Sequence, residues 1–273
     1  MPFLMMIHLQ SITRRVWKPD LDAEFPFSIP VIRSLETLEF KTSVTFFVGE
    51  NGSGKSTLLE ALACAVESVT VGSESVKTDR SLAPQRALAK YLKPVWTKRT
   101  RKGFFLRAED FFGYAKQLVR MRAEMEDDLC EIDREYQGRS ATAVGLAKMP
   151  YARELADMQR RYGAGLDVAS HGENFIALFK NRFVPGGLYL LDEPEAPLSP
   201  IRQLGLISLL KEMVAQDAQF VVSTHSPILM AFPEATILSF DGGKIRPVRY
   251  ADLEQITLLR DFLNNPAAFT GRL

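Results

Sequence analysis

Cysteine is scarce in this chain, with two residues in 273, and the two form no recognisable motif. Cys64 and Cys130 lie far apart and outside any Cys-x-x-Cys pattern. This spacing gives no indication of a disulfide framework or of a structural zinc site. We therefore expect two core thiols and a cytoplasmic, reducing environment.

The chain also lacks an excess of charge and long apolar runs. Its 34 Lys and Arg balance 33 Asp and Glu, so the net charge of +1 creates no field that would attract nucleic acid or an anionic membrane. The apolar stretch 1–9 is shorter than the roughly 20 residues that span a bilayer, and we read it as a first β-strand. We expect no direct membrane insertion. Basic clusters at 98–102 and 160–161 leave nucleic-acid binding open, with solvated loop charge as the alternative.

Three short apolar runs, at 44–48, 188–191 and 220–223, are typical of strands buried on both faces of a sheet. The strand, loop and helix over 44–69 begin a parallel α/β unit. Functional residues then gather at the carboxyl ends of the strands.

The region between these strands, residues 77–182, is rich in charge and predicts mostly helix. One helix would begin near Asp110 as N-cap and run for about 27 residues, or roughly 40 Å. Its apolar stripe repeats at spacings of three and four, which predicts packing against neighbouring helices. The stripe consists of Phe111, Ala115, Leu118, Met125, Leu129, Ile132 and Tyr136.

The last part of the chain predicts a hairpin and a helix. Strands at 237–240 and 244–248 flank an Asp-Gly-Gly turn, and 252–263 reads as a terminal helix.

The strongest motif, residues 49–57, matches the phosphate-binding loop in the strand-to-helix context that this motif requires. Glycines let successive N–H groups point at phosphate, and the helix N-terminus adds positive charge. The Lys55 ammonium would reach the β- and γ-phosphates, and the Ser56 hydroxyl would bind Mg²⁺. The expected nucleotide-binding residues of the loop are Gly49, Glu50, Asn51, Gly52, Ser53, Gly54, Lys55, Ser56 and Thr57.

Polar side chains also follow the other two buried strands. Asp192 would hold Mg²⁺ through water, and Glu193 would orient or deprotonate the attacking water, which contributes about 10² to 10⁴ in rate. His225 follows the third strand and would contact the γ-phosphate; a structural role is the alternative. The expected catalytic residues are Glu193, His225 and Lys55, and the expected metal ligands include Ser56 and Asp192.

The order of these motifs resembles the ABC-type ATPase superfamily. Gly-x-Asn-Gly-x-Gly-Lys-Ser-Thr, Asp-Glu-Pro-Glu and Ser-Thr-His-Ser-Pro carry the resemblance, which is greatest to the RecF-like, chromosome-organising and overcoming-lysogenisation-defect branch and its small stand-alone ATPases. It implies an α/β P-loop NTPase fold with a mainly parallel core sheet. Residues 1–273 would form one domain, with a core lobe at about 1–76 and 183–273 and an inserted helical lobe at about 77–182.

The resemblance also implies residues that act outside the phosphate loop. Ser170 and Gly172 match the superfamily signature that binds the ATP of an opposite subunit, whereas His171 and Glu173 depart from it. A helix N-terminus capped by Ser170 is the alternative. Glu109 occupies the position of the Mg²⁺-sensing glutamine, as a third metal-site residue.

ATP and Mg²⁺ are therefore the expected cofactors. The resemblance implies ATP hydrolysis that drives a head-to-tail, ATP-dependent homodimer, coupled to a partner effector in DNA maintenance or phage defence. The alternatives are the ATPase subunit of a membrane transporter and a nucleotide-binding scaffold with little turnover. Ser199, where transporters usually carry Asp, favours the first reading. Trp17 and Phe25 are candidates for stacking on adenine, with a core role as the alternative.

Overall fold

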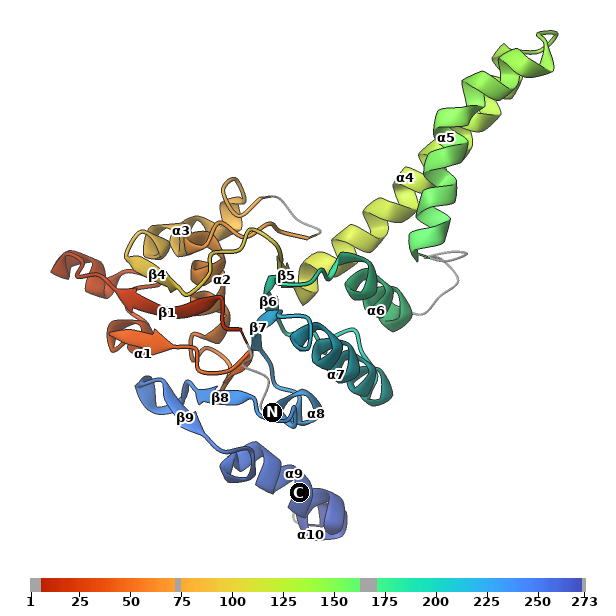
Figure 1. The fold of residues 1–273 in the computed structure, drawn as a ribbon. Coiled ribbons are helices and arrows are strands. Elements are labelled where there is room, and N and C mark those ends of the chain that lie inside the picture. Colours follow the sequence, from red (N-terminus) through yellow and green to blue (C-terminus); the bar gives the residue numbers. More distant parts are fainter. Residues whose placement is uncertain (1–5, 72–74, 163–170, 272–273) are drawn as a thin grey trace.

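The computed structural model describes residues 6–71, 75–162 and 171–271, which form an α/β head with a projecting helical arm (Figure 1). The strands are β1 (Leu9–Arg14), β2 (Thr37–Glu39), β3 (Val44–Val48), β4 (Leu92–Trp96), β5 (Phe105–Arg107), β6 (Leu188–Asp192), β7 (Gln219–Ser223), β8 (Thr236–Ser239) and β9 (Arg246–Val248). The α-helices are α1 (Pro30–Arg33), α2 (Lys55–Ala65), α3 (Ala83–Ala89), α4 (Ala108–Glu135), α5 (Ala141–Tyr162), α6 (His171–Arg182), α7 (Pro200–Val214), α8 (Pro227–Met230), α9 (Glu254–Asn264) and α10 (Pro266–Thr270). Short 3₁₀ turns occupy Pro19–Ala23, Arg80–Leu82, Asp241–Gly243 and Tyr250–Asp252.

The main sheet has the order β5-β6-β7-β3-β8-β9, and all of its pairs are parallel except the β8–β9 hairpin. The three apolar runs form β3, β6 and β7, as predicted, and β7 lies between the other two. Every residue of β3 and β7 is buried, because the sheet is covered on both faces. Because β3, β6 and β7 are parallel, their carboxyl ends lie at the same edge of the sheet.

Two apolar cores lie on opposite faces of the main sheet. One core joins it to α6, α7 and α8, with Phe46, Phe179 and Leu210 among its members. The other joins it to α1, α2 and α3, and includes Phe47 and Leu59. The helix that follows the phosphate loop and the helix that follows the signature region therefore cover different faces.

A second, antiparallel sheet has the order β2-β1-β4. A strand was expected at 1–9, but the first described strand, β1, begins only at Leu9 and ends at Arg14. The described part of 77–182 is mostly helical, as predicted, but it also contains β4 and β5, which pair with β1 and β6. Charged and polar residues around these short strands, such as Lys93 in β4, concealed them in the sequence.

The helices α4 and α5 contact each other as an antiparallel pair that projects from the head (Figure 1). Lys148 Nζ on α5 lies 2.5 Å from Asp133 Oδ2 on α4. The described residues of the predicted stripe, Met125, Leu129, Ile132 and Tyr136, are partly buried; the side chains of its first three residues lie outside the described part. We call this helical pair the arm.

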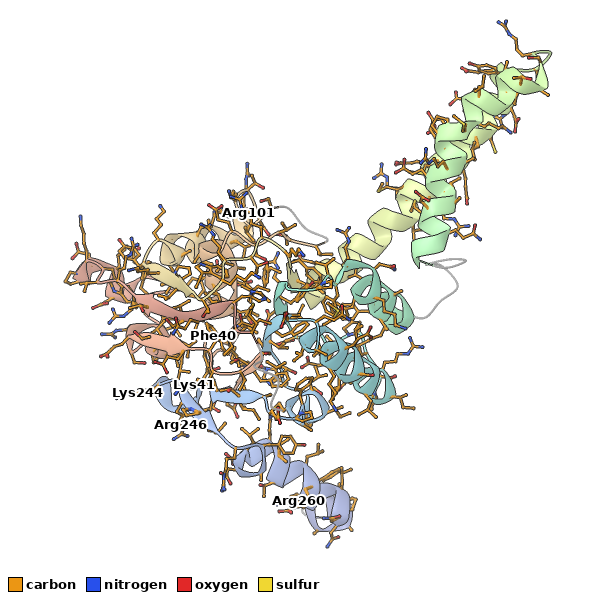
Figure 2. The ribbon with its side chains drawn as sticks, in the orientation of Figure 1. Phe40, Lys41, Arg101, Lys244, Arg246 and Arg260 are labelled. Carbon is orange, nitrogen blue, oxygen red and sulfur yellow. The ribbon has the colours of Figure 1, made fainter. Side chains whose placement is uncertain are left out.

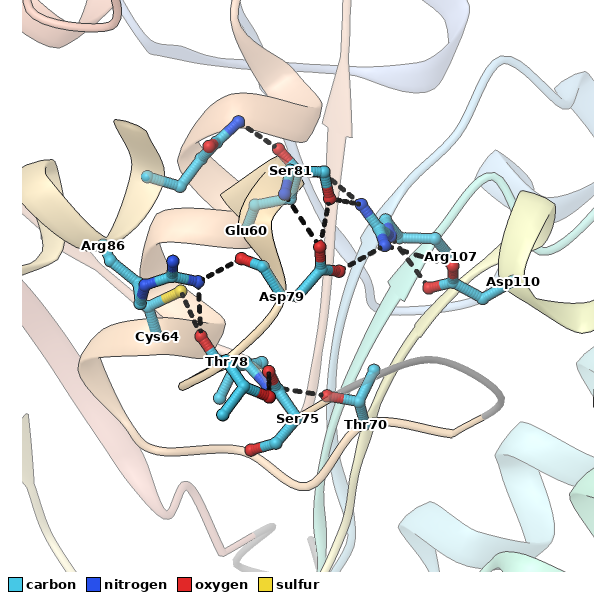
Figure 3. A network of polar contacts seen from close by, with 12 residues as sticks. Glu60, Cys64, Thr70, Ser75, Thr78, Asp79, Ser81, Arg86, Arg107 and Asp110 are labelled. Atoms are coloured by element: carbon cyan, nitrogen blue, oxygen red, sulfur yellow. Dashed lines mark hydrogen bonds and ion pairs between the residues drawn. The ribbon is translucent and has the colours of Figure 1, made fainter. Parts of the chain in front are cut away.

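A buried ionic network lies at the base of the arm (Figure 3). Arg107 at the end of β5 contacts Glu60 of α2 at 3.5 Å, Asp79 at 3.0 Å and Asp110 of α4 at 2.8 Å. Burial opposes ionisation of Asp79, but hydrogen bonds from Ser81 and the charge of Arg107 lower its pKa. Asp110 is thus not the N-cap of α4; Arg107 occupies that position. The network joins the arm to the helix that carries the phosphate loop.

The predicted hairpin and terminal helix are confirmed as β8–β9 and α9. In the described part of the chain, no helix combines the length and apolarity that a bilayer crossing requires. Basic side chains lie at separate places in Figure 2: Arg101 in the loop between β4 and β5, Lys244 and Arg246 at the hairpin, and Arg260 on α9. The cluster at 98–102 is largely exposed loop, and the side chains of Arg160 and Arg161 lie outside the described part.

Candidate functional site

The phosphate loop connects the buried strand β3 to α2, in the strand-to-helix setting predicted for it. Gly49, Gly52 and Gly54 have φ values of 142°, 80° and 99°, in the region that side chains rarely adopt. A Cβ atom on Gly54 would lie 2.8 Å from Ile29 Cγ2 and 2.9 Å from Val31 Cγ2. Conformation and space therefore both favour glycine at this position.

Lys55, the first residue of α2, is buried inside the curve of the loop. Its Nζ atom donates hydrogen bonds of 2.8 Å to the backbone oxygens of Gly49 and Glu50. Burial lowers the pKa of Lys55, and the carboxylates of Glu193 and Asp192 oppose that shift. An anion in the loop would favour the charged ammonium in the same way.

Ser56 and Asp192 meet beside the loop, with the Ser56 hydroxyl 3.0 Å from Asp192 Oδ1. Burial raises the pKa of Asp192 to about 6, although the hydrogen bond from Ser56 opposes the shift. Among the described residues, no three His, Cys, Asp or Glu side chains lie close enough together to form a metal site. One hydroxyl and one carboxylate suit Mg²⁺, which keeps several waters and takes further oxygens from phosphates.

Glu193 and His225 face each other at the ends of β6 and β7. Glu193 Oε1 lies 3.7 Å from His225 Nε2, too far for a hydrogen bond, and both side chains are partly exposed. Glu193 has φ +48°, an uncommon conformation for this residue type, and its backbone N–H donates to Ser223 O at 2.9 Å. The strand ends thus hold a carboxylate and an imidazole beside open space.

Asp241 is a site residue that the sequence interpretation missed, because its Asp-Gly-Gly segment was read only as a turn. Its Oδ1 accepts the Glu50 N–H at 2.8 Å, and its Oδ2 accepts the Ser239 hydroxyl at 3.0 Å. The hairpin therefore fixes the start of the phosphate loop. A cleft of about 880 Å³ lies between the loop, the hairpin and α9, with Ser53, His225, Asp241, Arg246 and Leu258 among its lining residues.

The remaining expected site residues lie partly outside the described part of the chain. Ser170 precedes α6 and is not described, and Gly172 lies in the first turn of α6. Glu109 follows β5 at the start of α4, but its side chain is not described.

The two candidates for stacking on adenine differ in exposure. Trp17 is buried, donates a 2.8 Å hydrogen bond to Asp22 and carries the Arg14 guanidinium over its ring at 4.4 Å. These contacts give it a core role. Phe25 is 56% exposed and remains accessible to a ligand.

Curated proteins with similar sequences include export ATP-binding/permease proteins. The macrolide export ATP-binding/permease proteins MacB of Psychrobacter cryohalolentis and Psychrobacter arcticus are 22% and 23% identical to the chain over 231 residues. The matches cover 84% of this chain but 32% of each relative, so the chain spans about a third of their length.

Solved structures show where the fold belongs. A nucleotide-free ATP-binding cassette from an ABC transporter matches 95% of the chain and 96% of its own, with a TM-score of 0.50 and 16% identity. The Smc head domain of Pyrococcus furiosus, bound to the C-terminal domain of ScpA, has a TM-score of 0.47 and 12% identity, with 94% of this chain and 100% of that chain covered. Residues 28–128 match a family model described as an AAA domain. Together with the phosphate loop and the order of the strands, the likeness to the ATP-binding cassette shows that the chain has a P-loop NTPase fold of the ABC type.

Proposed function

We propose that the chain binds ATP with Mg²⁺ and hydrolyses it to ADP and phosphate. The observation that carries the proposal is the meeting of Ser56 with Asp192, 3.0 Å apart, beside Lys55 and the Glu193–His225 pair. Two oxygen ligands, one buried cation and a carboxylate facing open space are the parts that phosphoryl transfer to water requires.

Each side chain has a separate role in this reaction. Lys55 offsets phosphate charge, and Ser56 and Asp192 would hold Mg²⁺, which would supply further positive charge at the phosphates. Glu193 orients a water and accepts its proton while the water oxygen bonds to the γ-phosphorus and the bond to the β–γ bridging oxygen breaks. His225 contacts the γ-phosphate. ADP then leaves with the electron pair of the broken bond.

We further propose that two copies close on two ATP molecules. Glu193 and His225 are partly exposed, and α6, whose first turn holds Gly172, covers the sheet face opposite α2. The first turn of α6 would then serve the phosphate loop of another copy. Ile201 and Leu204, at the start of the helix that follows the Asp-Glu loop, are 81% and 58% exposed, which suits a surface that becomes covered.

The division into lobes belongs to the same proposal. One ATPase domain would comprise a core lobe, which holds both sheets and the helices that cover them other than α6, and a helical lobe of α4, α5 and α6. The phosphate loop lies in the first part and Gly172 in the second, so a dimer would bring the two parts of different copies together.

An ATPase subunit of a membrane transporter is the second candidate, favoured by the likeness to MacB over 84% of the chain. The altered signature and Ser199 support the switch instead. Purification of the tagged protein with its native partners distinguishes the candidates: a multi-spanning membrane protein would favour the transporter, and a non-membrane effector the switch.

Turnover and solution mass, measured together, test the proposal. Wild type should release phosphate slowly, and Glu193→Gln should reduce the rate about 10²- to 10⁴-fold and form a dimer only with Mg·ATP. Glu212→Gln, an exposed change on α7, is the control and should behave as wild type. A Glu193→Gln variant that hydrolyses ATP normally would refute the role of Glu193. A variant that binds ATP but stays monomeric would refute the dimer.

A further inference from the structure

Glu195 connects the loop after the Asp-Glu pair to the loop that carries His225. Its Oε1 accepts a 2.7 Å hydrogen bond from the His225 backbone N–H. Burial raises the pKa of Glu195, against the effect of the hydrogen bond from the His225 N–H. A carboxyl group taken out of water for this contact is costly to bury unless its hydrogen bonds compensate.

Gln203 makes a second connection between the same two loops. Its Oε1 accepts from the Ser226 hydroxyl at 2.6 Å, and its Nε2 donates to Leu198 O at 3.1 Å. The Ser226 oxygen in turn accepts the N–H groups of Ile228 and Leu229 at the start of α8, each at 3.1 Å. Gln203 therefore ties the end of the Asp-Glu loop to the residue that follows His225.

These contacts form a frame around the Glu193–His225 pair. The two strand ends are joined by the bond from Glu193 N–H to Ser223 O at 2.9 Å, and the loops beyond them by Glu195 and Gln203. Glu193 and His225 do not hydrogen-bond to each other, so their 3.7 Å separation depends on the backbone positions that this frame sets.

We propose that Glu195 is a positioning residue that holds His225 opposite Glu193, and that Gln203 supports it by holding Ser226. The inference deepens the proposed ATPase function and rests on it. A side chain that positions the imidazole should affect the rate of the chemical step, because a displacement of about 1 Å at a reacting group costs about 10²-fold. It should leave ATP binding to the phosphate loop almost unchanged.

Three variants separate positioning from a general contribution to folding. Glu195→Gln keeps an oxygen acceptor at nearly the same place, whereas Glu195→Met keeps the length and removes the acceptor. Gln203→Met removes the second connection. Glu212→Met, on the exposed face of α7, is the matched control. Circular dichroism confirms that each variant is folded.

The first readout is the division between kcat and KM for ATP. We expect Glu195→Met to lower kcat about 10- to 100-fold with KM within about threefold of wild type. Glu195→Gln should recover most of that loss, and Gln203→Met should show a smaller fall in kcat. Equal behaviour of the Gln and Met variants at position 195, or a loss confined to KM, would overturn the proposal.

The second readout does not need turnover. The chain has three histidines, so the ring ¹⁵N signals can be assigned with His225→Gln. We expect the His225 signal to shift or broaden in Glu195→Met and in Gln203→Met, but to stay close to wild type in Glu195→Gln. An unchanged signal in both Met variants would overturn positioning even if wild type proves inactive. If wild type is inactive and the signal moves as expected, only the ATPase proposal fails. If Glu195→Met does not fold, the His225 signal is compared between Gln203→Met and Glu195→Gln. A shift in Gln203→Met alone supports the proposal, and an unchanged signal in Gln203→Met overturns it.

Discussion

The Ser56 hydroxyl donates a 3.0 Å hydrogen bond to Asp192, which joins the first turn of α2 to the end of β6. The hydrogen bond stabilises the ionised carboxylate, but burial outweighs it, and the pKa of Asp192 rises to about 6. A carboxyl with a raised pKa destabilises the fold once it is ionised. The site thus has a cost in stability that a neutral residue would not have.

We expect Asp192→Asn to abolish hydrolysis and yet stabilise the metal-free fold at neutral pH. The pKa of Asp192 rises from 3.8 to about 6 on folding, so the folded state binds the proton more tightly. Its contribution to stability is therefore largest below pH 4 and declines as the pH rises to about 6. Asn lacks this titration, so the variant should gain about 1 to 3 kcal/mol relative to wild type between pH 4 and 7.5.

Urea unfolding in EDTA at both pH values measures this difference. Asp20→Asn, which removes a carboxylate on an exposed 3₁₀ turn, is the control variant. Parallel pH profiles for wild type and Asp192→Asn would contradict the raised pKa.

Gly54→Ala should impair both the fold and nucleotide binding. Alanine would have to adopt φ +99°, and its Cβ atom would lie 2.8 Å from Ile29 Cγ2. We expect the two effects to lower the free energy of unfolding by about 1 to 3 kcal/mol. Gly145→Ala is the matched control, since its Cβ would meet no atom within 4 Å and alanine is a better helix former. Thermal unfolding and titration with a fluorescent ATP analogue are the measurements. A Gly54→Ala protein that binds the analogue as wild type does would show that the loop adapts.

Arg107→Met should reduce the free energy of unfolding by about 3 to 5 kcal/mol. The change would leave carboxylates of Glu60, Asp79 and Asp110 close together without the guanidinium that they share. Arg120→Met removes an exposed pair with Glu124 on α4 and should cost about 0.5 kcal/mol or less. Urea unfolding compares the two. Similar losses in both variants would mean that the network contributes no more than a surface pair.

The two cysteines should react with thiol reagents at very different rates. Burial raises the pKa of Cys64 to about 11, so about one molecule in 10³ is thiolate at pH 8, and the side chain is only partly accessible. Cys130 is exposed on α4, contrary to the expectation of a core thiol. Iodoacetamide followed by mass spectrometry should modify Cys130 first. Equal rates at both positions would contradict the burial of Cys64. The variant Cys130→Ser allows the slow modification of Cys64 to be measured by itself.

The sequence predicted the parallel sheet because β3, β6 and β7 are apolar runs whose polar residues begin where the strands end. The same pattern located the phosphate loop and the residues that follow the strands. By contrast, β4 contains Lys93 and Pro94 and β5 has three residues, so neither has the length or alternation that identifies a strand. The pairing of β4 with β1 was consequently not predicted.

Interactions between distant side chains had no local signal. Asp241 contacts the phosphate loop across 191 residues, and Glu195 reaches His225 across 30. Only the folded arrangement brings these pairs together, because an acid in a turn and an acid after Asp-Glu-Pro look like ordinary polar positions. A motif therefore located the candidate reacting groups, while the contacts that hold them required the structure.

The length of the arm would convert a small rotation at its base into a large displacement at its outer end. Its first helix is 28 residues long, about 42 Å, and its base joins α2 through Arg107. For a helix of this length, a rotation of about 10° at the base would move the outer end by about 7 Å. Small shifts around the phosphate loop would thus become displacements that a spin label or fluorophore on Cys130, near the outer end, could record as a change in distance.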